Sequence, residues 1–248
     1  MKVYIITDLE GSAGILNRDD YASHQGRYYE QAKRLVTLEV NAAIEGAVDA
    51  GATKFLVVDG HGPGGICQEL LHPQAQLFAG RPLSFPFGLD ASFSCAMMVG
   101  QHAKAGTIDG HLAHTGYQAV ADLVLNGLSM GELGLNMLLA SYFFVPTVMV
   151  AGDVAACREA EALVPQVQVA AVKEGINWGS AVHLHPEKAR ALIREQAKRA
   201  VRSLKEIPCF MLDAPYKRKV EYWGTSAAQK NIKEDETEDL LELLKRGY

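Results

Sequence analysis

Five side chains that can bind a metal ion stand at the ends of apolar segments in roughly the first half of the chain. Asp8 and Glu10 follow the first apolar run, His61 and His102 each follow another, and Glu132 opens a longer apolar segment. Carboxylates and imidazoles suit Zn²⁺ or Mn²⁺ rather than a metal that needs soft sulfur ligands. Two such metals about 3.5–4 Å apart can polarise a scissile carbonyl and activate a water. The placement therefore predicts a dinuclear hydrolase.

The shared position of these residues carries more weight than any one of them. In an open α/β sheet, ligands gather outside the carboxyl ends of the strands, so acids and histidines that recur there predict one crevice. Each residue also has a simpler explanation. Asp8 and Glu10 can meet solvent or cap a helix, and Glu132 can be an N-terminal acid that the helix dipole favours by roughly 0.3–1 kcal/mol. A buried Glu132 would favour metal, because an unpaired buried carboxylate is costly.

Two loops hold the histidines. His61 lies in a glycine-rich loop that lets the backbone approach a bound group closely, and the alternative is a flexible turn histidine. Asp59 either orients an imidazole or forms the turn at the strand end, and the second reading is preferred. The loop after His102 contains His111 and His114, and loops on a rigid sheet concentrate catalytic groups. His111 is expected at the surface or behind the site.

The elements that must position these residues alternate β-rich apolar runs with helical patterns. This order predicts an α/β fold with a mainly parallel sheet flanked by helices. The first helix is predicted from about Tyr29 to Ala50, with Gly51 as its stop. Asn126 and Gly127 mark a hairpin, so an antiparallel excursion that interrupts the parallel order is expected near residues 118–131. Further strands are predicted at 54–59, 95–99, 147–151 and about 167–171, and further helices at 132–144, at 154–163 with Asp153 as cap, and at 186–204.

The C-terminal stretch has a different composition. Short β-like runs are predicted at 209–212 and 220–223. Residues 230–248 are highly charged apart from a cluster of leucines, which predicts a surface helix or an oligomer contact. The leucines of this apolar face are Leu240, Leu241, Leu243 and Leu244.

Length and composition limit the remaining possibilities. The 248 residues predict a single catalytic α/β domain, 1–248, either undivided or with a smaller C-terminal part from about residue 152. A net charge of -5 argues against nucleic acid as a partner. No apolar run is long enough to cross a membrane, and the first residues show no signal-peptide pattern. We expect buried cysteine thiols in a reducing cytoplasm, and surface or structural roles for the other histidines. These residues are Cys67, Cys95, Cys157 and Cys209, and His24, His72, His183 and His185.

Several dispersed motifs occur in an order that is typical of one known family. They include Asp8–Gly14, Asp59–His61, Gly100–Ala103, His114 and Gly131–Asn136. Over most of the first 175 residues, the chain resembles the zinc-dependent D-aminopeptidases of the DppA type. The same resemblance extends to Ala151–Asp153 and Ala171–Lys173.

The resemblance implies a site, an activity and an assembly. It implies two zinc ions (Zn2+) per chain, a plausible bridging role for Asp8, and His114 as the catalytic histidine. It also implies release of an N-terminal D-amino acid, typically D-alanine, from short peptides by ring-shaped homo-oligomers. The implied zinc ligands are Asp8, Glu10, His61, His102 and Glu132. The family assigns the histidine matching His114 as nucleophile, but an imidazole there could equally relay a proton or hydrogen-bond an oxyanion.

Two other functions remain open at this point. A metal-dependent amidase could use the same residues on a non-peptide substrate. A non-catalytic module could bind a small peptide or nucleotide, with the histidines incidental. Bound zinc that is lost on substitution of Glu132 would separate the enzyme classes from the binding module, and a substrate panel would separate the two enzymes.

Overall fold

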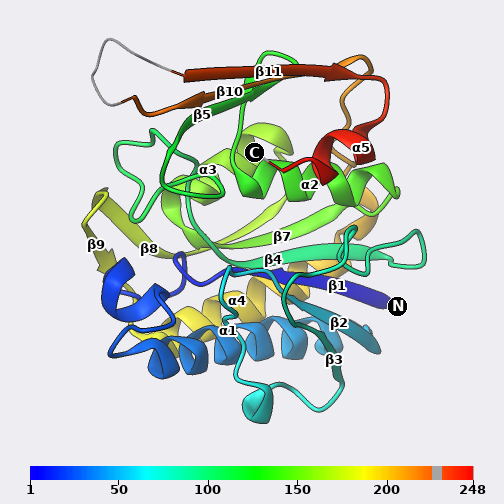
Figure 1. Ribbon diagram of the computed structural model, residues 1–248. Helices are drawn as coiled ribbons and strands as arrows, with labels where there is room; N and C mark the ends of the chain where they lie inside the picture. Colours follow the sequence, from blue (N-terminus) through cyan, green and yellow to red (C-terminus); the bar gives the residue numbers. More distant parts are fainter. Residues whose placement is uncertain (225–230, 248) are drawn as a thin grey trace.

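The computed structural model describes residues 1–224 and 231–247, and its main body is a seven-stranded sheet between two layers of helices (Figure 1). The strands follow the order β3-β2-β1-β4-β7-β8-β9, and only β9 runs antiparallel to its neighbour. This confirms the predicted α/β fold with a mainly parallel sheet. The strands are β1 (Lys2–Thr7), β2 (Lys54–Asp59), β3 (Ala75–Phe78), β4 (Cys95–Gln101), β7 (Thr147–Asp153), β8 (Gln168–Asn177) and β9 (Ser180–His183).

The helices cover both faces of this sheet. On one face α1 packs beside α4, and on the other α2 packs beside α3 (Figure 1). A short helix, α5, lies against α2 near the C-terminus. The helices are α1 (Tyr29–Asp49), α2 (Glu132–Tyr142), α3 (Val154–Leu163), α4 (Pro186–Arg202) and α5 (Leu240–Lys245), with helical turns at Arg18–Ala22, Gln68–Leu70 and Leu204–Glu206.

Helix α1 shows how the sequence pattern produces an element. Val36, Val40, Ala43 and Ala47 are fully buried and recur at spacings of three and four, so they form one apolar face. The helix ends before Gly51, whose φ of +96° is a conformation that glycine adopts without strain. The predicted helix from Tyr29 is therefore confirmed to within one residue.

The strands β4 and β7 are buried along their whole length. Cys95 and Cys157 are buried thiols, whereas Cys67 and Cys209 are half-buried, and all four are unpaired. Asp153 caps α3 as predicted, because its Oδ1 accepts the Ala155 backbone N–H at 2.7 Å. No helix in residues 1–224 and 231–247 combines the length and apolar character needed to cross a membrane.

The predicted antiparallel excursion forms a separate sheet. The hairpin turn is confirmed, since Asn126 and Gly127 have φ values of +48° and +83°. The excursion does not interrupt the parallel sheet, because its strands pair with two strands from the C-terminal part of the chain. This four-stranded sheet has the order β11-β10-β5-β6, with β5 (Val120–Leu125), β6 (Leu128–Ser129), β10 (Tyr216–Tyr222) and β11 (Asn231–Thr237).

The predicted surface helix over 230–248 is wrong in its first half. Residues 231–237 form strand β11, and the helix covers only α5, while Lys230 and Tyr248 lie outside the described residues. Strand β11 pairs with β10, and Asp235 forms an ion pair with Arg218 directly opposite, at 2.6 Å. The strand is stabilised by pairing with a distant segment, and its charged sequence has no apolar alternation that would indicate a strand. The sequence pattern therefore predicts a helix where the structure has β11.

Two smaller predictions near the C-terminus also need correction. The β-like run at 209–212 is not a strand, and Phe210 instead donates its backbone N–H to the Ser141 hydroxyl at 2.9 Å. The run at 220–223 is part of β10, which begins earlier, at Tyr216. The apolar face of the last helix is real, because Leu240 and Leu243 are buried.

Candidate metal centre

The carboxyl ends of β1, β2 and β4 meet at one edge of the large sheet. Asp8 and Glu10 follow β1, His61 follows β2, and His102 follows β4. These strands are adjacent and parallel, so their ends lie together. Glu132 reaches the same edge from the first turn of α2. The structure therefore brings all five predicted metal-binding residues into one region.

Within this region the side chains form two groups with ligand atoms no more than 4.8 Å apart. One group contains Asp8, Glu10 and His61, and the other contains His102, His114 and Glu132. Asp8 connects them, because its Oδ2 lies 3.1 Å from Nε2 of His102. Two adjacent groups connected by a carboxylate can hold a pair of metal ions.

The tautomer of His102 shows how this arrangement suits a cation. Its Nδ1 lies 2.9 Å from the Ala103 carbonyl oxygen, which can only accept a hydrogen bond, so Nδ1 carries the proton. Nε2 lies 3.1 Å from Asp8 and 3.2 Å from Glu132. Burial opposes protonation of the ring, but the hydrogen bonds and charges of these carboxylates outweigh it and raise the pKa of His102 well above its usual value. A lone pair that faces two carboxylate oxygens needs a positive charge between them, either a proton or a metal ion.

His114 is held in the same tautomer beside His102. Its Nδ1 lies 2.8 Å from the Leu112 carbonyl oxygen, and its ring stacks on that of His102 with centroids 3.9 Å apart. Its Nε2 is 4.0 Å from the nearer oxygen of Glu132. Burial, followed by the neighbouring His102, lowers the pKa of His114. A neutral imidazole with a free Nε2 can accept a proton during a reaction.

The group of Asp8, Glu10 and His61 contains polar atoms without protein partners in the described part of the chain. Nε2 of His61 lies 3.5 Å from Oε1 of Glu10, whereas Nδ1 of His61 and Oε2 of Glu10 are buried and find no hydrogen-bond partner among the described residues. Glu132 is half-buried as a side chain, and its Oε2 is buried 3.2 Å from Nε2 of His102. Buried polar atoms of this kind fit a site that holds additional ligands.

The carboxylates affect one another electrostatically. Burial and the neighbouring Glu10 raise the pKa of Asp8 to about 6. Burial also opposes ionisation of Glu10, but the hydrogen bond and charge of His61 outweigh it and hold the pKa of Glu10 well below its usual value. Three carboxylates in one buried site repel each other, and divalent cations remove this repulsion.

Asp59 organises the His61 loop and does not orient the imidazole. Its two carboxylate oxygens accept the backbone N–H groups of Gly65 at 2.7 Å and Ile66 at 3.3 Å. The preferred sequence interpretation, a turn former at the strand end, is therefore confirmed. Arg81 also binds this loop through the backbone carbonyls of Asp59 and His61.

Lys173 belongs to a motif of the family resemblance, but the sequence analysis did not place it at the site. It is buried on β8, and its Nζ donates to the backbone carbonyl of Glu10 and lies 2.9 Å from Nδ1 of His111. His111 is fully buried behind the site, which is one of the two positions expected for it. Its backbone N–H donates to the Asp153 carboxylate at 3.2 Å. A lysine among buried strand residues was the available signal.

The remaining histidines lie outside the two groups. His183 accepts the Gly14 backbone N–H at 3.1 Å, and His185 caps α4 through the Glu187 backbone N–H at 3.3 Å. His72 accepts the N–H of Gln74 at 3.2 Å, and His24 is exposed. These positions agree with the surface or structural roles predicted for them.

The fold and site together define a class of protein, the metal-dependent hydrolases built on an α/β sheet. The comparison with known families is specific. Residues 1–239 match the family model Peptidase_M55, described as D-aminopeptidase, and the chain belongs to this family. The chain is thus a member of an enzyme family of metallopeptidases.

Two similar proteins support the assignment. The D-aminopeptidase of Bacillus subtilis (strain 168) is 38% identical over 206 residues, which cover 82% of this chain and 74% of that protein. The structure is also similar to that of the Zn-dependent D-aminopeptidase DppA from Bacillus subtilis, described as a self-compartmentalizing protease. That similarity has a TM-score of 0.93 at 31% identity and covers 99% of this chain and 94% of the other.

Proposed function

We propose that this protein is a zinc-dependent aminopeptidase that releases N-terminal D-amino acids, D-alanine among them, from short peptides. The observation that carries the proposal is the position of Nε2 of His102, which lies 3.1 Å from Asp8 and 3.2 Å from Glu132. The membership in the D-aminopeptidase family and the similarity to a Zn-dependent relative support zinc as the cation. The geometry of the site and the family membership both agree with metal-dependent hydrolysis of a peptide bond.

The proposed zinc ligands are the five residues of the two groups other than His114. Asp8 is the proposed bridging ligand, because its carboxylate belongs to one group and lies 3.1 Å from His102 in the other. When bound, two zinc ions would polarise the scissile carbonyl and make a water more acidic. The five ligands are Asp8, Glu10, His61, His102 and Glu132.

His114 is proposed to move protons rather than to hold zinc. Its ring is oriented by the Leu112 carbonyl, and its Nε2 is farther from Glu132 than that of His102 is, at 4.0 Å against 3.2 Å. Its lowered pKa leaves the ring neutral near pH 7, so it can accept a proton and pass it to the leaving amine.

The zinc site is tested by elemental analysis of the purified protein beside two variants. Glu132→Ala removes a carboxylate of the site, and Glu161→Ala removes an exposed helical carboxylate elsewhere, on α3. We expect about two zinc ions per chain in the wild type and in Glu161→Ala, and a clear loss in Glu132→Ala. Equal zinc content in all three proteins would refute the ligand assignment.

The substrate is tested on the same preparations. D-alanyl and L-alanyl p-nitroanilides are compared with D-alanyl dipeptides and with small non-peptide amides. We expect release of D-alanine and little cleavage of the L-compounds. Activity restricted to the non-peptide amides would replace the peptidase assignment with the amidase alternative.

We also propose that the chain forms a ring-like homo-oligomer. The similarity to a self-compartmentalizing protease supports assembly, and so do apolar side chains that the single chain leaves exposed. The most exposed are Ile108, Phe144 and Val182. Light scattering coupled to size-exclusion chromatography should give a mass several times that of one chain, and a monomer at micromolar concentration would contradict the proposal.

A further inference from the structure

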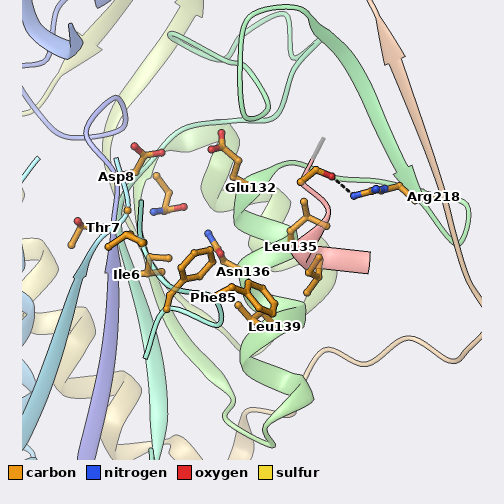
Figure 2. A pocket seen from close by; sticks show the side chains of 15 residues that line it. Ile6, Thr7, Asp8, Phe85, Glu132, Leu135, Asn136, Leu139 and Arg218 are labelled. Atoms are coloured by element: carbon orange, nitrogen blue, oxygen red, sulfur yellow. Dashed lines mark hydrogen bonds between the residues drawn. The ribbon is translucent and has the colours of Figure 1, made fainter. Parts of the chain in front are cut away.

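A cavity of about 240 Å³ opens directly beside Asp8 and Glu132 (Figure 2). Its walls are mainly apolar, with polar groups from Gln101, Asn136 and Arg218 among them. Leu135 and Leu139 come from α2, and Phe85 comes from the loop between β3 and β4. The cavity is therefore a continuation of the candidate metal centre, with a different chemical character.

The metal-binding residues and the apolar walls share the same elements. On α2, Glu132, Leu135 and Leu139 lie three, four and seven residues apart, so they project from one face of the helix (Figure 2). Ile6 of β1 and Asp8, which follows this strand, both line the cavity. A group bound at the metals is thus positioned to extend one side chain along these walls.

The C-terminal helix closes the cavity. Leu244 of α5 and Gly247 contribute to its lining. Arg218 holds this segment in place, because its guanidinium donates to the backbone carbonyls of Leu243 and Gly247 while Asp235 balances its charge (Figure 2). The cavity is consequently formed by parts of the chain that are far apart in sequence.

We propose that this cavity receives the side chain of the N-terminal D-residue and selects large apolar side chains, such as those of D-leucine and D-phenylalanine, over that of D-alanine. The inference rests on the proposed aminopeptidase function and deepens it by naming the preferred substrate class. D-Alanine remains a substrate, but its methyl group leaves most of the cavity unfilled.

The position of the cavity assigns it to the N-terminal residue. An aminopeptidase binds the amine and the scissile carbonyl of the N-terminal residue at its metal centre, so the side chain of that residue starts beside the proposed ligands Asp8 and Glu132. Both residues line this cavity, whereas His114 lines a separate cavity of about 270 Å³ with Trp178 and Trp223. Because His114 is the proposed donor to the leaving amine, its cavity lies on the side of the departing peptide.

The size and polarity of the cavity determine the preferred side chain. Its volume of 240 Å³ is below the roughly 300–1,000 Å³ of sites that enclose a whole small molecule, so it suits a single side chain. Each methylene group that a substrate adds to an apolar pocket strengthens discrimination by about tenfold or more. A leucine side chain uses these walls, and an alanine methyl group does not.

The test compares kcat/KM for D-Ala-Gly, D-Leu-Gly and D-Phe-Gly on zinc-loaded protein. We expect the D-leucyl or D-phenylalanyl peptide to exceed D-Ala-Gly by at least about tenfold. Leu135→Trp, which fills the cavity from a partly buried position, should reduce this ratio to about one. Leu128→Trp is the matched control, because Leu128 is exposed on the β5–β6 hairpin, and it should keep the wild-type ratio.

Each other outcome has a definite meaning. A wild type that cleaves D-Ala-Gly faster than D-Leu-Gly overturns the inference and leaves the proposed function intact, whereas cleavage of none of the three peptides overturns the proposed function. If Leu135→Trp changes the ratio between D-Ala-Leu and D-Ala-Gly instead, the cavity serves the departing residue and the inference is wrong. Zinc content and melting temperature of Leu135→Trp must match the wild type, and Phe85→Ala, which enlarges the cavity, should favour D-Phe-Gly further.

Discussion

At the scale of single residues, the neighbouring imidazoles of His102 and His114 differ in how far their Nε2 atoms lie from the carboxylates. His102 and His114 stack on each other, and both carry their proton on Nδ1, where a backbone carbonyl accepts it. Nε2 of His102 lies 3.1–3.2 Å from two carboxylates, whereas Nε2 of His114 lies 4.0 Å from one. The first geometry fits a ligand, and the second fits a group that exchanges protons.

This difference predicts separate effects on zinc content and on rate. His114→Ala should retain the wild-type zinc content and lower kcat by about 10²–10⁴-fold, the range of a lost acid–base group. His24→Ala is the matched control, because His24 is exposed and belongs to neither group of the candidate metal centre, and its kcat should be unchanged. Metal analysis with steady-state kinetics separates the two roles. Loss of zinc from His114→Ala would make this residue a ligand.

At the scale of elements, the site depends on backbones that approach one another closely. Gly11 lies against β4, and its N–H donates to the Gly100 carbonyl at 2.8 Å. A Cβ at Gly11 would lie 1.9 Å from the backbone oxygen of Gln101, which cannot move without displacing the strand. The segment of Gly11 carries Asp8 and Glu10, and the end of β4 carries His102.

Gly11→Ala is therefore predicted to separate the two halves of the site. We expect a loss of about 1–3 kcal/mol in the free energy of unfolding, with reduced zinc content and activity. Gly62→Ala is the control, because a Cβ there meets no atom within 4 Å although the residue adjoins His61. Chemical denaturation of both variants measures the difference. A Gly11→Ala protein as stable as Gly62→Ala would show that the two strands can separate without cost.

The same scale explains which elements the sequence predicted. Helix α1 and the Asn126–Gly127 turn carry local signals in the sequence. These are the apolar spacing and an Asn-Gly pair, which tolerates positive φ, and both elements occur as expected. Strand β11 carries none, because its residues are charged and it is stabilised by β10, which lies on a different part of the chain. Local patterns cannot report a partner strand, so this element was predicted as helix.

At the scale of the whole molecule, the two sheets have different tasks. The parallel sheet brings the ends of β1, β2 and β4 to one edge, where the candidate metal centre lies. The antiparallel sheet holds α5 against α2 through Arg218 and so completes the neighbouring cavity. Both tasks require contacts between distant segments, which explains why the cavity could not be predicted.

The order of apolar runs and the residues that follow them were sufficient to predict the α/β sheet and the five candidate ligands, whereas the role of His114 was implied only by the resemblance to a known family. Strand ends in a parallel sheet must converge, and this rule depends only on chain order and periodicity. The tautomers of His102 and His114, the burial of Lys173 and the walls of the apolar cavity became visible only in the folded chain. Each of these depends on the separation of atoms that are far apart in sequence, and such separations are set by packing rather than by local pattern.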